Sequence, residues 1–174
     1  LDVDSTMSSY DLLRAYSVHT PLAVGRTGVC SAGDFLQHVA AVAAHLPETC
    51  KDGARSELLV TCQDRYYLAV VLLAAWQRGH VIALPPNARD QTLSELSAHC
   101  TLALHDGAGA GQDLRAWLET GLETGLETQP DKKADALPYP TLPSDRALVT
   151  IYTSGSTGAP TACRKTAAQL LGEA

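Results

Sequence analysis

Residues 58–86, which read LLVTCQDRYYLAVVLLAAWQRGHVIALPP, decide the fold of this chain. The apolar run 57–62 at their start has the length and composition of a buried strand. Asp64 stands where a helix N-cap belongs and Gly79 where a C-terminal capping glycine belongs, so the apolar residues between them predict a largely buried helix. A second apolar run, 80–84, ends at two prolines. Since two strands joined by one helix pair in parallel, the stretch predicts a βαβ unit.

The downstream sequence continues the same alternation. Residues 90–99 have the spacing of an amphipathic helix, and 101–105 have the composition of a third strand. Residues 146–152 read as a further strand that follows a connector rich in proline and charge. The short links between these elements favour parallel strands with right-handed crossovers.

The upstream sequence adds a hairpin and a helix. Ser31 and Asp34 resemble a capping box, and the apolar spacing that follows predicts a helix over 34–46. Two apolar pieces around a glycine-containing turn predict a small β-hairpin over 21–30. We therefore expect an α/β layered domain with a mainly parallel sheet flanked by helices.

Composition restricts the classes of function. The chain has 174 residues, of which 45% are hydrophobic and 18% charged, as expected of one globular domain. A net charge of −6 without a Lys/Arg cluster argues against nucleic acid as a partner. The longest apolar run, 66–76, is too short to span a membrane, which needs about 20 residues.

The cysteines and histidines predict neither a disulfide framework nor a metal site. The five cysteines are an odd number, widely spread and without a CxxC pair, which indicates free thiols in a reducing compartment and hence a cytoplasmic protein. His38 and His45 lie seven residues apart on the predicted helix, where they would share a face as a weak metal candidate. His99 and Cys100 could be drawn as a catalytic dyad, but adjacent residues rarely face each other.

Three segments carry weaker signals. Residues 1–6, ahead of the sole methionine, are interpreted as a vector remnant or disordered start of a domain over 7–174. Residues 107–144 are predicted to be a mobile segment, with a short helix at 113–118. The repeat LETGLETGLET over 118–128 places glycine at every fourth position, at a cost of about 1 kcal/mol each against alanine, so we expect a frayed helix or a loop there.

The candidate chemistry is concentrated in residues 152–160, YTSGSTGAP, at the end of the last predicted strand. Two glycines allow successive backbone N–H groups to converge on an anion, and the hydroxyls add neutral donors. A polyphosphate is the natural ligand of such a loop. The residues alone leave open an ordinary Ser/Gly-rich turn. The spacing and the missing lysine exclude a GxxxxGK[ST] loop.

The same nine residues closely resemble the signature loop of the adenylate-forming enzyme superfamily, whose usual form is YTSGSTG-x-PK. The family includes acyl-CoA synthetases, aryl-CoA ligases, luciferases and the adenylation domains of peptide synthetases. Residues 31–46, SAGDFLQHVAAVAAHL, and residues 58–86 also resemble its N-terminal lobe. The resemblance begins at about Pro21, is weakest over 108–144, and implies the N-terminal part of the large lobe of such an enzyme.

The resemblance implies an ATP-dependent carboxylate ligase that uses Mg²⁺. A carboxylate would attack the α-phosphate of ATP to give an acyl-adenylate and pyrophosphate, and a thiol of coenzyme A or of a carrier protein would then take the acyl group. In the family the loop holds the β- and γ-phosphates, and its donors stabilise the departing pyrophosphate. By position, the phosphate ligands here are Thr153, Ser154, Gly155, Ser156, Thr157 and Gly158.

The chain departs from the family pattern in two ways. Thr161 stands where the family has lysine, and the next basic residues, Arg164 and Lys165, are candidates for the missing cation or are ordinary surface charges. With its lysine displaced from the usual position, the chain resembles ligases of bacterial polyene-pigment pathways. The chain also ends at Ala174, ahead of the family's acyl pocket, metal-binding glutamate and catalytic lysine, so no catalytic residue is assigned.

We therefore expect the N-terminal fragment of a longer enzyme, inactive by itself because half a cleft cannot orient two reactants. Apolar surface exposed by truncation would allow the fragment to self-associate. One alternative is a non-catalytic binding or interaction module that retains the fold. Another is an unrelated phosphotransferase, for which Asp106 is the sole candidate acid.

Overall fold

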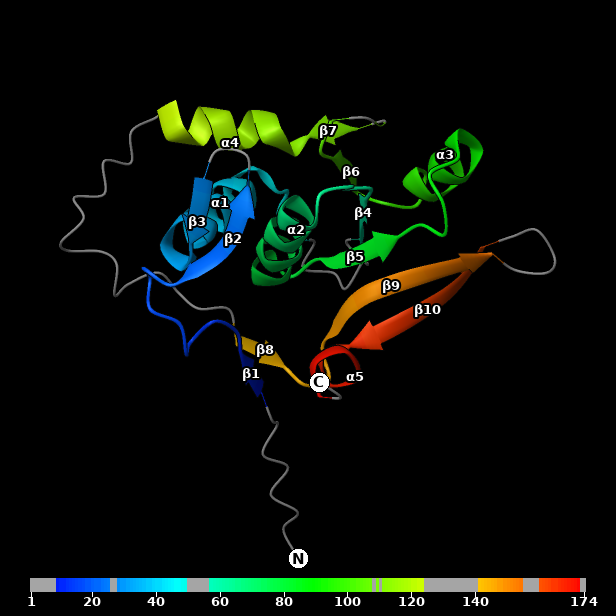
Figure 1. Cartoon of the computed structure of the whole chain (residues 1–174). Helices are drawn as coiled ribbons and strands as arrows, with labels where there is room; N and C mark the ends of the chain where they lie inside the picture. The colour runs from blue at the N-terminus through cyan, green and yellow to red at the C-terminus, as the bar shows by residue number, and fades with distance from the viewer. Residues whose placement is uncertain are drawn as a thin grey trace, which may run out of the picture.

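The computed structural model describes residues 9–25, 28–49, 57–107, 109, 111–123, 141–154 and 160–172. A six-stranded sheet forms its centre (Figure 1). In sheet order its strands are β10 (Pro160–Thr166), β9 (Ala147–Ser154), β5 (Val81–Leu84), β4 (Glu57–Val60), β6 (Leu102–His105) and β7 (Gln112–Asp113). Adjacent strands are parallel except β9 and β10, which are antiparallel. The predicted α/β fold with a mainly parallel sheet is confirmed.

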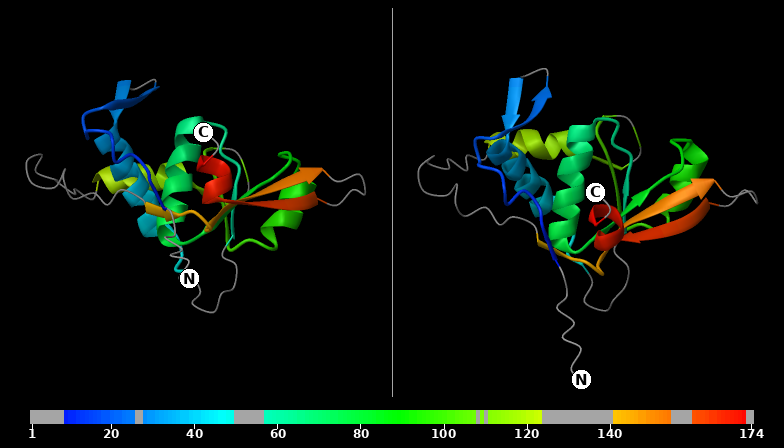
Figure 2. Two further views of the ribbon diagram at one scale, coloured as in Figure 1. Left: turned by 90° about the horizontal axis from the view of Figure 1, so that it is seen from below. Right: turned by 60° about the horizontal axis from the view of Figure 1, so that its bottom comes forward.

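Helices cover both faces of this sheet (Figures 1 and 2). On one face, Leu58 and Ile82 belong to the main core with α1 (Ala32–His45) and α2 (Arg65–Arg78), and α4 (Leu114–Glu123) packs against α1. On the other face, Leu59 and Ala83 pack with Leu96 of α3 (Asp90–Ser97). Successive strand residues point to opposite faces, so the two clusters lie on opposite sides of the sheet.

Local sequence explains where the covering helices begin and end. Ser31 and Asp34 form the predicted capping box at the start of α1. The Asp64 side chain accepts a hydrogen bond from the backbone N–H of Tyr66 at the start of α2. Gly79 ends α2 in the left-handed conformation, with φ of 89°, which glycine adopts without steric cost. These three capping predictions are confirmed.

The order of the strands creates a topological switch point. From β4 the chain passes through α2 to β5 on one side, and from β5 it passes through α3 to β6 on the other side. The carboxyl ends of β4 and β6 therefore border a crevice of the kind where open α/β sheets usually bind ligands.

Small elements complete the fold. The hairpin predicted over 21–30 is confirmed as β2 (Pro21–Gly25) and β3 (Gly28–Ser31). Two short strands, β1 (Ser9–Asp11) and β8 (Thr141–Pro143), pair antiparallel, and α5 (Ala167–Leu171) follows β10. The sequence analysis did not predict five of the observed elements, which are β1, β7, β8, β10 and α5.

The segment predicted to be mobile, 107–144, contains secondary structure in its described part, and its mobility stays a prediction. β7 and α4 lie near its start and β8 lies near its end. α4 continues through Gly121 into the repeat over 118–128, further than the short helix predicted at 113–118. Residues 1–6 and the remainder of the repeat lie outside the described residues.

Large apolar side chains are exposed at few described positions. These are Tyr16, Val24 and Val29, of which the two valines lie on the β2–β3 hairpin. None of the three belongs to a strand of the six-stranded sheet, and the apolar surface expected to allow self-association stays a prediction. In the described part of the chain, no helix combines the length and the apolar character needed to cross a membrane.

Candidate functional site

The described residues of the YTSGSTGAP motif, 152–154 and Pro160, lie where β9 ends and β10 begins (Figure 1). β9 pairs with β5 as far as Ile151, and beyond it Thr153 pairs with Thr161 and Ser154 with Pro160. Residues 152–154 and 160–162 thus form a two-stranded arm that extends past the parallel strands. Of the predicted phosphate ligands, Thr153 and Ser154 end β9, whereas Gly155, Ser156, Thr157 and Gly158 lie outside the described residues.

The two predicted phosphate ligands that the structure describes, Thr153 and Ser154, lie at an exposed edge of the sheet. The hydroxyl of Thr153 donates to the carbonyl oxygen of Thr161 across the arm, over 3.4 Å. The side chain of Ser154 points to the opposite face, because neighbouring strand residues alternate. Both residues are exposed at the carboxyl end of β9, which is the edge of a parallel sheet where ligands usually bind. Their contact with phosphate stays a prediction.

The two candidate cations lie far from the tip of the arm. Arg164 and Lys165 follow Pro160 by four and five residues on β10, so their Cα atoms are about 14 and 17 Å beyond it at the usual strand rise. Their side chains point to opposite faces of β10. Arg164 is bound to a carboxylate, and Lys165 is half-buried opposite Val149. Thr161, one residue after Pro160, is exposed.

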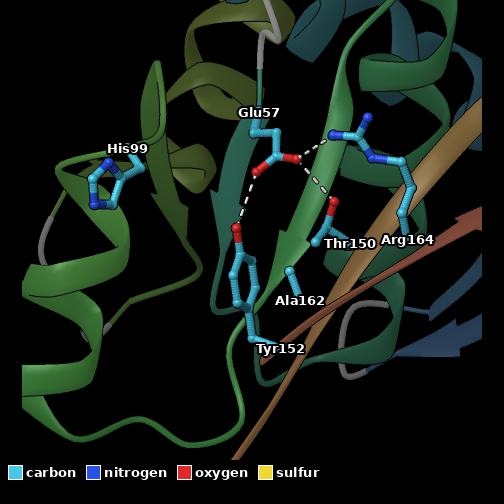
Figure 3. Close-up of a pocket in the computed structure, with 6 residues that line it drawn as sticks. All are labelled: Glu57, His99, Thr150, Tyr152, Ala162 and Arg164. Atoms are coloured by element: carbon cyan, nitrogen blue, oxygen red, sulfur yellow. Dashed lines mark hydrogen bonds and ion pairs between the residues drawn. The ribbon is translucent and has the colours of Figure 1, made fainter. Parts of the chain in front are cut away.

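Arg164 belongs to a polar network centred on Glu57 (Figure 3). Its Nη2 atom lies 2.9 Å from Glu57 Oε1, which also accepts a hydrogen bond of 2.9 Å from the Thr150 hydroxyl. The hydroxyl of Tyr152 donates to Glu57 Oε2 over 3.2 Å. Glu57 is 8% exposed, so these three donors compensate for the loss of water around its charge.

The network borders a pocket of about 440 Å³ on the α3 side of the sheet. Ala162 and His99 also line it, and His99 lies across the pocket from the network (Figure 3). Burial, followed by the charge of Glu57, raises the pKa of Tyr152, and the same two causes raise the pKa of Cys100 to about 11. Cys100 is therefore a protonated thiol at neutral pH, which argues against the His99–Cys100 dyad.

Sequence reasoning missed Glu57 as a functional candidate. It opens an otherwise apolar strand, and the sequence analysis treated it as part of that strand alone. A charged residue at the start of a fully buried strand requires partners, and this is the signal that could have identified it. The identity of those partners depends on the pairing of β9 with β5, which is set by residues about 90 positions away.

The side chain of Asp106 occupies part of the switch-point crevice between β4 and β6. The carboxylate of Asp106, just after β6, accepts the backbone N–H of Gln63 over 3.0 Å and that of Asp64 over 2.7 Å. A pocket of about 420 Å³ remains there, also lined by Tyr67, Gly107 and Arg115. Asp106 thus caps the turn before α2, and this structural role argues against its role as a phosphotransferase acid.

The histidines of α1 have separate partners. His38 Nδ1 lies 2.5 Å from the hydroxyl of Tyr66, and burial lowers the pKa of His38. The ring of His45 stacks on Trp117, with ring centroids 5.1 Å apart. Within the described ranges, no group of three or more His, Cys, Asp or Glu side chains could hold a metal ion.

No protein-family model and no curated protein sequence matches this chain. Solved structures do match it, at low sequence identity. o-Succinylbenzoate coenzyme A synthetase (MenE) from Bacillus subtilis, in complex with AMP, has a TM-score of 0.62 and 12% identity over 91% of this chain and 43% of that chain. The N-terminal subdomain of Klebsiella oxytoca NpsA has a TM-score of 0.55 and 19% identity over 80% of this chain and 36% of that chain.

VinN, in a complex with L-aspartate, has a TM-score of 0.53 and 24% identity over 81% of this chain and 38% of that chain. The chain thus spans well under half the length of the structures it matches. At these identities the likeness concerns the fold. The chain has the fold of the N-terminal part of adenylate-forming enzymes, and the fold expected from the resemblance of its motifs is confirmed.

Proposed function

We propose that this chain is the N-terminal part of an ATP-dependent carboxylate ligase that forms an acyl-adenylate and pyrophosphate. The loop between β9 and β10 holds the ATP phosphates that leave as pyrophosphate. Its ligands are the hydroxyls and backbone amides of Thr153, Ser154, Gly155, Ser156, Thr157 and Gly158. A thiol of coenzyme A or of a carrier protein then accepts the acyl group.

One observation carries this proposal: a TSGSTG sequence joins two antiparallel strands at the carboxyl edge of a parallel sheet, in a chain with this fold. Solved structures of the same fold include complexes with AMP and with anthranilyl-AMSN, which supports a nucleotide role for the fold. If the loop were an ordinary Ser/Gly-rich turn, its composition would be explained. The agreement between the motif, which resembles that of adenylate-forming enzymes, and the fold, which matches theirs, would not be explained.

The described residues supply no cluster of acidic side chains for Mg²⁺, so we assign no metal ligand to this part of the enzyme. When bound with ATP, Mg²⁺ would supply charge neutralisation on the phosphates. The four cysteines that the structure describes are free, which supports the proposal of a reducing, cytoplasmic location. The finer proposal of a polyene-pigment ligase rests on the displaced Lys165, and none of the comparisons supports it.

A non-catalytic module with the same fold is the second candidate. Thr161 in place of the family lysine favours it, as does the engagement of Arg164 by Glu57. Carboxylate-dependent exchange of pyrophosphate into ATP separates the two candidates when measured on the intact gene product. We propose that the 174-residue chain alone lacks this activity, and robust exchange by the chain alone would contradict that statement.

Self-association of the chain stays a prediction. Sedimentation velocity tests it, and a single monomeric species at high protein concentration would contradict it.

Titration with inorganic pyrophosphate tests the role of the loop directly. In a ¹⁵N-labelled sample of the chain, the amide signals of residues 153–159 and of Thr161 should shift with a weak, saturable affinity. The turn of the β2–β3 hairpin, between Gly25 and Gly28, is a matched control, because it is a second glycine-containing hairpin turn and its signals should not move. Equal shifts at both turns, or none at either, would overturn the proposal.

A further inference from the structure

The carboxylate of Glu57, on β4, accepts hydrogen bonds from two strands that are not adjacent to β4. β4 is separated from β9 by β5, and β10 lies one strand further. At the usual spacing, β9 and β10 are about 10 and 14 Å from β4. The side chain therefore crosses β5, where the small, fully buried Ala83 is the register partner of Thr150.

Each strand of the hairpin donates to this carboxylate. Thr150 and Tyr152 donate from β9, and Arg164 donates from β10. In the described register, Thr150 is the partner of Arg164, so Glu57 contacts both members of one cross-strand pair. Tyr152 is the residue directly before the predicted phosphate ligands. Glu57 thus connects the core of the parallel sheet to the base of the arm.

The arm needs such a connection because it leaves the sheet. Beyond Ile151, β9 pairs with β10 alone, and a two-stranded ribbon is marginally stable by itself. Hydrogen bonds to a charged, buried acceptor are stronger and more directional than bonds between neutral groups. They fix the direction in which the arm, residues 152–154 and 160–162, departs from the sheet.

We propose that Glu57 is a positioning residue for the phosphate loop: through Thr150, Tyr152 and Arg164 it sets the orientation of the β9–β10 hairpin and thereby the affinity of the loop for pyrophosphate. The inference rests on the proposed function of the loop. It assigns Arg164 to orientation of the hairpin through Glu57, and no direct phosphate contact is required of it.

The test compares pyrophosphate affinity and arm orientation in four variants of the chain. Glu57→Gln keeps the shape and one acceptor oxygen, and Arg164→Gln removes the ion pair from the other side. We expect each to weaken pyrophosphate binding about three- to tenfold, which corresponds to the net contribution of one ordinary hydrogen bond, because the effect reaches the loop only through the orientation of the hairpin. The double variant should bind no more weakly than either single variant, because both act through one contact.

Leu59→Ala is the matched control for loss of stability. Leu59 lies two residues after Glu57 on the same face of β4, is 2% exposed and packs in the small apolar cluster. The Leu59→Ala substitution should lower the stability of the fold without altering pyrophosphate affinity. Residual dipolar couplings of the N–H bonds of Tyr152, Thr153 and Ser154 report arm orientation, and they should change in the Glu57→Gln and Arg164→Gln variants but not in the control.

The outcomes separate this inference from the proposed function. If wild type binds pyrophosphate and Glu57→Gln binds equally well, or no worse than Leu59→Ala, the positioning role is overturned while the loop assignment stands. A gain of affinity in Glu57→Gln would also overturn it, since it would show that the released Arg164 binds phosphate itself. If wild type produces no loop shifts, the proposed function fails, and the positioning role fails with it.

Discussion

Restoring a lysine beside the loop should strengthen pyrophosphate binding by a predictable factor. Thr161 is exposed on β10, one residue past Pro160, and opposite Thr153 at the base of the loop. A lysine there would place its ammonium about 7 Å from a bound pyrophosphate, given a strand rise of about 3.4 Å per residue. At this distance in water, and at physiological salt, attraction to about three negative charges is worth about 0.7 kcal/mol, or threefold in affinity.

Cys163→Lys provides the control, because Cys163 lies on the same face of β10 and is also exposed. It is two residues further from the loop, so the ammonium would lie about 14 Å from the phosphate, where screening reduces the gain to about 1.3-fold. The assay is the pyrophosphate titration followed by loop amide signals at constant ionic strength. Equal gains from Thr161→Lys and Cys163→Lys would refute binding at the loop, and so would no gain from Thr161→Lys.

Three further predictions concern the supporting structure. Asp106→Ala should lower the free energy of unfolding by about 2–3 kcal/mol in urea denaturation, since it leaves two backbone N–H groups without their charged acceptor, and it should not change pyrophosphate affinity. Hydrogen bonds from Ser31 lower the pKa of Asp34, so its stabilisation of α1 is present above about pH 4 and is lost as pH falls through the lowered pKa; Asp34→Asn should remove this part of the pH dependence in thermal melts. Iodoacetamide at pH 7 should modify the exposed Cys163 before Cys100, whose pKa is raised to about 11, as peptide mass spectrometry would show.

Local signals were sufficient to predict the part of the fold around β4, α2 and β5. Asp64 and Gly79 cap α2 through interactions within a few residues, and the apolar runs on either side are buried in the sheet as their composition indicates. Strand β10 was missed because Pro160–Thr166 is polar and mostly exposed, as an edge strand can be. Its pairing is specified by the hairpin with β9 and not by its own residues.

The candidate site divides in the same way. The sequence identified the loop because TSGSTG is a contiguous pattern whose composition indicates its chemistry. Glu57 and Arg164 are 107 residues apart, and neither has a local pattern that indicates the other. Arg164 was considered as a phosphate ligand or a surface charge, because the sequence contains no sign of the buried carboxylate that it meets.

The hydrogen bonds that Asp106 accepts in the crevice connect the end of β6 to the start of α2. The backbone N–H groups of Gln63 and Asp64, just before α2, both donate to the carboxylate of Asp106. Replacement of Asp106 by glycine would leave both N–H groups without this acceptor, and the nearby guanidinium of Arg115 is already paired with Asp113. The turn that starts α2 therefore depends on one side chain from the end of β6, so the link between these two elements rests on a single residue.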